Sequence, residues 1–386
     1  MSPQFSDNFL WGAATAAHQI EGGNVNNDWW EREHADPPVV PESSGDACDS
    51  YHRYEEDLDL LVELGLNAYR FSLEWSRIEP AEGEFSRASV DHYRRVVEAC
   101  LVRGLTPMVT LHHFTIPLWF QRAGGWRAPN AADLFGRYCE RDLPVIETEV
   151  PWVCTINEPN LMAVLSPILE RGTTPKSFPS EPDHALGEAL LVSHRQAKDV
   201  LSSVSGVRSG YTVACFNFHP VGEVVPEWIP RAADWYLEQA ADDDFLGVQC
   251  YSRILLGPDG PLEPDPSAEL TSIGTEYYPD CVAETVTRAW ELSRRTPLIV
   301  TENGIPTDDD EQRGRYVREA IAGLARAMAD GVDVGGYLHW SLIDNFEWIW
   351  GFGPKYGLAA LDRQTFARTL KPSARVFADI VRRARI

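Results

Sequence analysis

Short apolar segments alternate with segments of helical spacing along this 386-residue chain. The apolar segments span residues 9–17, 68–75, 106–113, 152–157, 210–216, 245–251, 298–301 and 334–340. The helical segments span residues 51–65, 86–104, 130–150, 183–204, 227–239, 281–295, 312–329 and 372–385. Such alternation predicts a parallel sheet, and eight units predict an α/β fold of the closed (β/α)8 type, the TIM barrel. We expect residues 1–386 to form one barrel domain.

An open, doubly wound sheet is the alternative that the same alternation allows. Sheets of that kind commonly bind nucleotides through a glycine-rich loop that follows a strand. No apolar segment of this chain is followed by such a loop. The sequence therefore favours the barrel.

Polar side chains stand at nearly every predicted strand end. They are Gln19, Glu21, Arg70, His112, His113, Asn157, Glu158, Asn217, Tyr251, Glu302 and Trp340. In a barrel the carboxyl ends of all strands converge on one pocket. Core packing would not select polar groups at these positions, so the pattern predicts a functional site at this end.

Two strand ends carry an acid in the same arrangement, Glu158 after the fourth segment and Glu302 after the seventh. Glycoside hydrolysis needs such a pair, one carboxyl protonated to donate to the leaving oxygen and one ionised to attack the sugar. Arg70 and Tyr251 are candidate partners that would favour the anionic form of Glu302. An unpaired buried guanidinium is costly, which also predicts a carboxylate partner for Arg70. We expect Glu158 to be the acid/base and Glu302 the nucleophile.

Charge and composition exclude several classes of partner and location. The formal net charge is −24, which argues against nucleic acid and anionic membranes. No apolar run approaches about 18 residues, and no signal peptide is expected at the N-terminus. The seven cysteines are scattered without a C-x-x-C pair, as in reduced cytoplasmic proteins. We expect a cytoplasmic protein.

No metal site is predicted. His112 and His113 are adjacent on a strand, and adjacent strand residues point to opposite faces. The acidic run 308–310 lacks the spacing of a calcium loop and is predicted to lie in a solvated turn.

Five segments together resemble the signature blocks of glycoside hydrolase family 1, the β-glucosidase family. They are FLWGAATAAHQIEG at 9–22, YRFS at 69–72, TINEP at 155–159, VTENG at 300–304 and WSLIDNFEW at 340–348. They follow the order of the family and cover nearly the whole chain. Residues 112–117 and 155–160 resemble its archaeal-like branch more than its plant enzymes. The resemblance implies a (β/α)8 barrel, a retaining double displacement through a covalent glycosyl-enzyme, and no metal or organic cofactor.

The resemblance also implies roles for single residues. It assigns Glu158 as acid/base and Glu302 as nucleophile, with Arg70 and Tyr251 supporting Glu302. Asn157 would hold the 2-hydroxyl of the sugar. Substrate binding would fall to Gln19, His113, Gln249, Trp340, Glu347 and Trp348, with the indole of Trp340 as the platform under the sugar. The implied substrate is a small-molecule β-glycoside, glucosides first and galactosides or fucosides next.

The chain departs from the family pattern in three places. Phe114 and Thr115 stand where the family usually has Trp and Asp, and Gln249 stands where it usually has Asn. The chain is also short between Glu158 and Tyr251, which predicts a wider mouth and tolerance of bulky leaving groups.

Three other functions stay open. A transglycosidase would use the same site, and a catalytically inactive barrel could still bind glycosides. Residues 355–356, Lys and Tyr, leave room for a 6-phospho-β-glycosidase, although the carboxylate of Glu347 would repel a phosphate.

Overall fold

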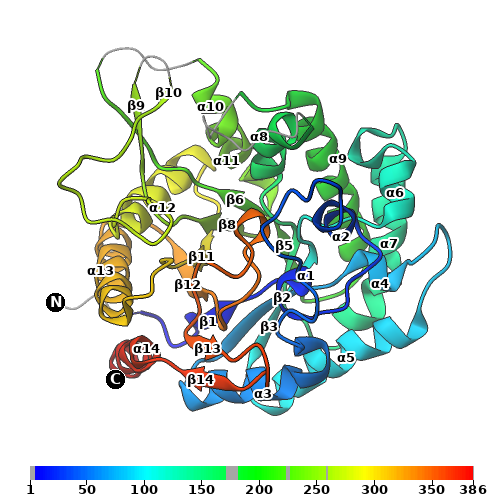
Figure 1. The fold of residues 1–386 in the computed structure, drawn as a ribbon, viewed down its shortest axis with the longest axis horizontal. Helices are drawn as coiled ribbons and strands as arrows, with labels where there is room; N and C mark the ends of the chain where they lie inside the picture. The colour runs from blue at the N-terminus through cyan, green and yellow to red at the C-terminus, as the bar shows by residue number, and fades with distance from the viewer. Residues whose placement is uncertain (1–4, 171–180, 223–226, 258–259, 386) are drawn as a thin grey trace.

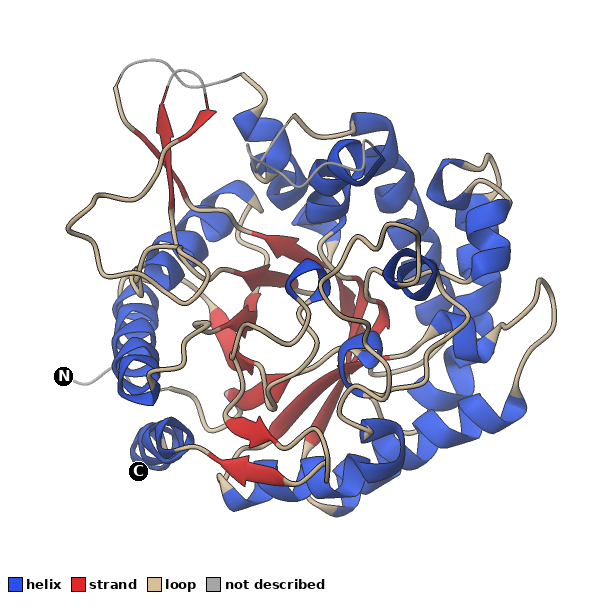
Figure 2. Ribbon diagram, viewed as in Figure 1, coloured by secondary structure: helices blue, strands red, loops and turns tan. Residues whose placement is uncertain are grey.

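A ring of parallel strands surrounded by helices forms the centre of the molecule (Figures 1 and 2). The computed structural model describes residues 5–170, 181–222, 227–257 and 260–385. The order of the strands is β5-β4-β3-β2-β1-β12-β11-β8-β6. Only Tyr211 separates β5 from β6, so both belong to the fifth strand and the sheet closes on itself. The predicted (β/α)8 barrel is confirmed.

The barrel strands are short and apolar. They are β1 (Leu10–Ala14), β2 (Ala68–Ser72), β3 (Thr106–His112), β4 (Trp152–Ile156), β5 (Arg208–Gly210), β6 (Thr212–Ala214), β8 (Leu246–Gln249), β11 (Leu298–Asn303) and β12 (Val334–Trp340). Every ladder between them is parallel. Nearly all of their residues are buried, as expected of strands covered on both faces.

Seven of the eight predicted helical segments form long helices of the outer ring. They are α3 (Ser50–Glu63), α5 (Arg87–Val102), α7 (Ala131–Ile146), α9 (His184–Leu201), α12 (Cys281–Leu292), α13 (Asp310–Ala329) and α14 (Pro372–Ala384). Side-chain oxygens of Ser86, Asp183 and Asp309 accept hydrogen bonds from the first turns of α5, α9 and α13. Each of these caps satisfies backbone donors that have no partner within the helix.

The structure differs from the sequence-based assignment at several elements. The predicted helix 227–239 is two short helices, α10 (Ile229–Ala232) and α11 (Asp234–Gln239), because the backbone at Ala233 is not helical. The predicted first strand ends early, and α1 (Ala17–Ile20) follows it, with the Ala17 amide bonded to Ser72 Oγ.

Other elements were not predicted. They are α2 (Asp28–Glu33), α4 (Trp75–Ile78), α6 (Leu118–Arg122), α8 (Pro159–Glu170), the small sheet β7 (Phe218–Pro220), β9 (Ile254–Gly257) and β10 (Gly260–Pro261), and the pair β13 (Ala359–Leu361) and β14 (Arg368–Leu370). β9 and β10 lie on an arm that extends away from the barrel (Figure 1). These strands have only two to four residues, too few to show a periodicity of two.

Within the described ranges, no helix combines the length and apolar character needed to cross a membrane. The same residues contain no group of three or more His, Cys, Asp or Glu side chains placed to hold a metal ion.

Candidate active site

Glu302 lies near the end of β11, and both oxygens of its carboxyl group accept hydrogen bonds. Oε1 accepts from Arg70 Nη1 at 2.6 Å and from Gln249 Nε2 at 2.8 Å. Oε2 accepts from the Tyr251 hydroxyl at 2.5 Å. Glu302 and Gln249 are also register partners on neighbouring strands, which explains their contact. One cation and two neutral donors thus hold the carboxyl of Glu302.

Arg70 projects from the middle of β2 and is 0 % exposed. Its guanidinium donates to three different acceptors: Glu302 Oε1, Asn157 Oδ1 at 2.5 Å and Thr110 Oγ1 at 3.0 Å. A buried guanidinium is stable only when it is paired and hydrogen-bonded. The strand can therefore carry Arg70 because these acceptors surround it.

Asn157 connects this group to the acid on the fourth strand. Its Oδ1 accepts hydrogen bonds from Arg70, from Gln249 Nε2 at 2.9 Å and from Thr212 Oγ1 at 3.0 Å. Because the guanidinium can only donate, the oxygen of Asn157 must face it. The side-chain nitrogen then faces His113 Nε2, at 3.3 Å. This Nδ2 is the group of Asn157 that remains for a ligand.

Glu158 follows Asn157 but has different surroundings. Its backbone N–H donates to O and Oγ1 of Thr212, at 3.1 and 3.0 Å, and its φ is +46°. Non-glycine residues seldom adopt this left-handed conformation, and functional sites are where it concentrates. Among the described residues, the carboxyl of Glu158 has no hydrogen bond and no ion pair.

The two carboxyls differ in what sets their protonation. Burial raises the pKa of Glu158 well above its usual range, and the charge of Glu302 raises it further, while Arg70 opposes both. Burial also raises the pKa of Glu302, but Arg70 and the Tyr251 hydroxyl lower it. When two carboxyls interact in this way, the negative charge of one raises the pKa of the other, so their pKa values move apart. The arrangement therefore favours a proton on Glu158 and a negative charge on Glu302.

Gln19 and the loop after β12 form a second polar group. Nε2 of Gln19 donates to Asn345 Oδ1 at 3.0 Å, to the Phe346 carbonyl at 2.7 Å and to Glu347 Oε2 at 3.4 Å. The other oxygen of Glu347 accepts from Trp340 Nε1 at 3.2 Å. Oε1 of Gln19 is buried without a partner among the described residues. It is available to a donor on a ligand.

Aromatic rings connect the two polar groups. His113 stacks on Trp340, with ring centres 5.9 Å apart, and on Trp348, with centres 6.3 Å apart. Trp348 also stacks on His18 at 5.6 Å, and its φ is +51°. Burial lowers the pKa of His113 well below its usual range, so its imidazole is neutral.

The sequence profile named glycosyl hydrolase family 1 matches residues 1–242 and 238–386. The chain belongs to this family. It is 29 % identical to β-glucosidase A of Thermotoga maritima over 98 % of both chains. It is 32 % identical to thermostable β-glucosidase B of Thermobispora bispora, over 98 % of this chain and 91 % of the relative.

Solved structures agree with the family assignment. The crystal structure of β-glycosidase BGL167 superimposes with a TM-score of 0.92 and 42 % identity, over 99 % of this chain and 97 % of that one. A β-glucosidase from Thermotoga maritima, in complex with glucoimidazole, superimposes with a TM-score of 0.89 and 28 % identity over 100 % of both chains. The chain is thus a glycoside hydrolase with the barrel of its family.

The structure of this family 1 hydrolase brings the predicted site residues into one connected group. They are Gln19, Arg70, His113, Asn157, Gln249, Tyr251, Glu302, Trp340, Glu347 and Trp348, with Glu158 joined to the group through its backbone, next to Asn157 and bonded to Thr212. Gln249 is notable, because both of its described side-chain bonds go to Asn157 and Glu302. Only its Oε1, which is buried without a described partner, is left for a ligand.

Sequence reasoning missed several members of this group. Thr110 and Thr212 are ordinary strand residues in the sequence, and only the barrel brings them to Arg70 and Asn157. Tyr356 is buried with its ring 5.6 Å from that of Tyr251. Burial raises its pKa, and the charges of Glu347 and Glu302 raise it further. From the sequence, Tyr356 is considered only together with Lys355, as a possible phosphate site.

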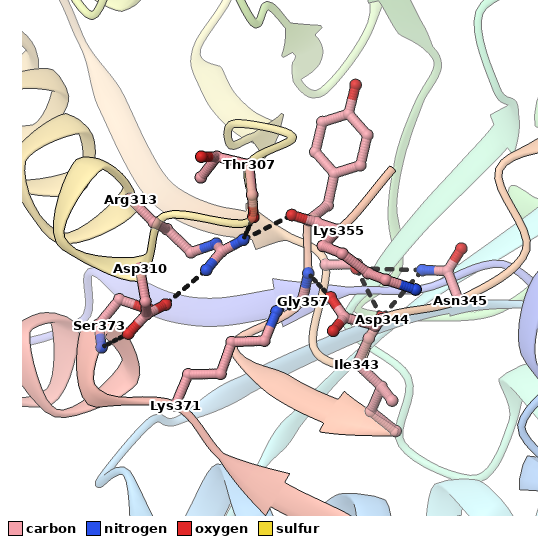
Figure 3. A network of polar contacts seen from close by, with 12 residues as sticks. Thr307, Asp310, Arg313, Ile343, Asp344, Asn345, Lys355, Gly357, Lys371 and Ser373 are labelled. Atoms are coloured by element: carbon pink, nitrogen blue, oxygen red, sulfur yellow. Dashed lines mark hydrogen bonds and ion pairs between the residues drawn. The ribbon is translucent and has the colours of Figure 1, made fainter. Parts of the chain in front are cut away.

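The outer side of the loop after β12 is tied to two helices (Figure 3). Arg313 of α13 donates to the carbonyls of Thr307 and Lys355, at 2.5 and 2.6 Å. Asp310 accepts from the backbone N–H and hydroxyl of Ser373 in α14, at 2.7 and 2.6 Å. The prediction of a solvated turn at 308–310 is therefore wrong for Asp310, because the first turn of α14 offers donors that have no partner in their own helix.

The segment between Glu158 and Tyr251 is described only in part. Residues 171–180 and 223–226 lie outside the described residues. The wider mouth expected from this short segment stays a prediction.

Proposed function

We propose that this glycoside hydrolase is a retaining β-glycosidase that cleaves terminal non-reducing β-D-glycosides, glucosides foremost. One observation carries the proposal: of two buried carboxyls, Glu302 has a cation and two donors, whereas the carboxyl of Glu158 has no described partner. A nucleophile and a proton donor need these opposite surroundings. The β-glucosidases named among its relatives support the choice of substrate.

In the first step, a carboxylate oxygen of Glu302 attacks C1 of the sugar. The bond from C1 to the leaving oxygen breaks, and that oxygen takes the proton of Glu158. The products are the free alcohol and a glycosyl ester on Glu302. Loss of the negative charge of Glu302 lowers the pKa of Glu158, since that charge raises it. Glu158 can then stay ionised until the second step.

In the second step, Glu158 takes a proton from water while the water oxygen attacks C1. The ester bond breaks, and Glu302 recovers its charge. Two inversions give net retention of configuration. A sugar hydroxyl in place of water would give transglycosylation by the same step. No step requires a metal ion or an organic cofactor.

The remaining side chains bind the sugar in this proposal. Asn157 holds the 2-hydroxyl through Nδ2, and Trp340 provides the platform. The other hydroxyls are bound by Gln19, His113, Glu347 and Trp348, while Gln249 orients Glu302 and offers Oε1 to the ligand. We place the function in one catalytic domain, residues 1–386, in the cytoplasm. The seven cysteines are all free, which fits a reducing compartment.

The test compares Glu302→Gln with Glu158→Gln on two aryl β-glucosides. Glu302→Gln should lose activity on both 4-nitrophenyl and 2,4-dinitrophenyl glucosides. Glu158→Gln should fail mainly on the poorer leaving group, because dinitrophenolate departs without a proton. Glu79→Gln is the matched control, a buried acid outside the site that bonds Trp75 and Gly83 and, like Glu302, pairs with an arginine, Arg137.

Other outcomes would point to another function. Wild-type turnover of 6-phosphoglucosides alone would identify a phosphoglycosidase. Binding of aryl glycosides without turnover would identify an inactive glycoside-binding barrel. Equal losses for both variants on both substrates would contradict the separate roles of the two acids.

A further inference from the structure

The amide of Gln19 contacts the inner side of the loop that carries Glu347, where Trp340 Nε1 also donates to Glu347. Nε2 of Gln19 contacts three consecutive residues, Asn345, Phe346 and Glu347, at 2.7 to 3.4 Å. The Phe346 backbone N–H returns a hydrogen bond to the Gln19 carbonyl at 3.3 Å. The position of Glu347 therefore depends on keeping this short segment in register with Gln19.

On its outer side, the loop contacts its own later residues at Asp344. Oδ1 of Asp344 accepts from the Gly357 N–H at 2.8 Å, and the Asp344 N–H donates to Ala359 O at 2.9 Å. A Cβ on Gly357 would come within 2.1 Å of the Asp344 nitrogen, so only glycine fits. Asp344 is thus the fixed point from which residues 345–347 reach Gln19.

Lys371 provides the charge opposite this fixed point (Figure 3). Its Nζ lies 2.7 Å from Asp344 Oδ1, and the two side chains are 13 % and 9 % exposed. Lys371 is the N-cap residue of α14. A cation at a helix N-terminus is unfavourable for the helix dipole. Stabilisation of α14 therefore does not explain Lys371, whereas the carboxylate of Asp344 does.

The base of Lys371 is itself rigid. Its backbone N–H donates to the Leu358 carbonyl at 2.9 Å. Two residues later, Ser373 is bonded to Asp310, which also pairs with Arg313 at 2.5 Å. The ammonium group therefore approaches Asp344 from a backbone fixed to α13.

We propose that Lys371 is a positioning residue for sugar binding: through Asp344 it holds residues 345–347 in register with Gln19, and it thereby sets the affinity for the glycone. Lys371 contacts no substrate in this arrangement. The inference rests on the proposed function, because it takes Gln19 and Glu347 as sugar ligands.

The same ion pair makes sugar binding sensitive to alkaline pH. Burial lowers the pKa of Lys371 to about 8, and Arg313 lowers it too, while Asp344 and Asp310 raise it. Above that pH the ammonium loses its proton, and Asp344 loses its counter-ion. Because this pKa lies below that of an unfolded lysine, the same deprotonation favours the folded state between about pH 8 and 10.4. Alkaline weakening of sugar binding would therefore not reflect global unfolding through this group.

The experiment measures binding of phenyl 1-thio-β-D-glucopyranoside by calorimetry between pH 6.5 and 9.5. All proteins carry Glu158→Gln, so that titration of the acid/base does not contribute. In this background Kd should rise about 3- to 30-fold as pH passes 8, the range typical of residues that act through others. Lys371→Met should show the weaker Kd at every pH. Lys371→Arg stays charged and should keep the tight Kd to pH 9.5.

Lys198→Met is the matched control. Lys198 lies in the last turn of α9, and its Nζ is 2.6 Å from Asp243. It should leave Kd and its pH dependence unchanged. A Kd in Lys371→Met that follows the parent protein at every pH would overturn the proposal, and so would an alkaline rise that persists in Lys371→Arg. The pH series on the parent protein does not depend on whether a Lys371 variant folds. A parent Kd that does not change between pH 6.5 and 9.5 would also overturn the proposal. Failure of the thioglucoside to bind any of these proteins would instead count against the proposed function.

Discussion

The carboxyls of Glu302, near the end of β11, and of Glu158, just after β4, have contrasting surroundings. The carboxyl of Glu302 receives three hydrogen bonds, from Arg70, Gln249 and Tyr251. Glu158 is held through its backbone, by Thr212, and its side chain has no described partner. Both are buried, so burial alone does not distinguish them.

The comparison shows that donors decide which acid is ionised. Burial disfavours the charge of either carboxyl, and each hydrogen bond to an oxygen restores it. One side of the site is therefore built to keep an anion, and the other leaves a carboxyl free to gain and lose a proton. Variants that remove the hydrogen-bond donors of Glu302 one at a time should bring the pKa of Glu302 closer to that of Glu158.

Arg70→Met should have the largest effect, because it leaves Glu302 buried without its cation. Removing one partner of a buried pair typically costs about 3–5 kcal/mol of stability. Arg70 lowers the pKa of Glu302, so its loss raises that pKa and moves the acid limb of kcat/KM to higher pH. Thermal unfolding and a pH–rate profile measure the two effects.

Arg368→Met is the matched control for this variant. Arg368 pairs with Asp57 at 2.8 Å, and both side chains are buried away from the two acids. It should lose stability to a similar degree while its pH–rate profile stays in place. An unmoved acid limb in Arg70→Met would show that Arg70 serves only the fold.

Tyr251→Phe should have the next largest effect, a loss of kcat of about 10- to 100-fold, as for a hydrogen bond to a charged group. The acid limb should again move to higher pH, since the hydroxyl lowers the pKa of Glu302. Steady-state kinetics from pH 4 to 8 gives both values. Tyr138→Phe removes a buried hydroxyl that donates to Leu111 O and should leave the profile unchanged.

Substitutions of Gln249 sharpen the comparison at the position where the chain departs from its family. Gln249→Leu removes donors to both Glu302 and Asn157 and should lower kcat/KM about tenfold. Gln249→Asn keeps the amide but shortens its reach and should lose less. If Asn instead proves better than Gln, the extra methylene has no positioning value for Glu302.

Thr212→Val should have the smallest effect, because the Glu158 amide keeps its bond to the Thr212 carbonyl. The hydroxyl of Thr212 also donates to Asn157 Oδ1, which keeps its bonds from Arg70 and Gln249, so loss of these two neutral hydrogen bonds predicts about a two- to tenfold fall in kcat. The fall should be greater for alkyl than for dinitrophenyl leaving groups, since only the former need the proton of Glu158. Thr285→Val, which removes a buried hydroxyl without a described partner on α12, is the control.

The sequence predicted the barrel and both acids because each depends on local patterns. Buried parallel strands are runs of apolar residues, and a polar residue where such a run ends is visible without any structure. Glu302 and Arg70 stand out for this reason, as polar residues in apolar segments. Strand bounds were less accurate, as at residues 9–17, where a side-chain contact between Ala17 and Ser72 starts a helical turn.

The rest could not be predicted because it joins residues far apart in the chain. Asp310 and Ser373 are 63 residues apart, and Asn157 and Thr212 are 55 apart. Nothing near Asp310 distinguishes it from a solvated acid. The amide of Gln249 could equally have faced a sugar, and only the register of β8 against β11 turns it to Glu302.

The fifth strand of the barrel is divided into β5 and β6, so the backbone hydrogen bonds that close the sheet are unevenly distributed around it. β5 and β6 contribute three residue pairs each, to β4 and β8, and no other barrel strand has so few over its two sides, although β1 with β2 and β11 with β12 also share three. Local opening starts where backbone bonds are fewest. In native-state hydrogen exchange, the amides of β6 should exchange before those of β2 and β3. Glu158 is attached to this joint through Thr212, so the proposed proton donor lies beside the strand with the fewest ladder pairs, whereas the proposed nucleophile Glu302 lies within the six-residue β11.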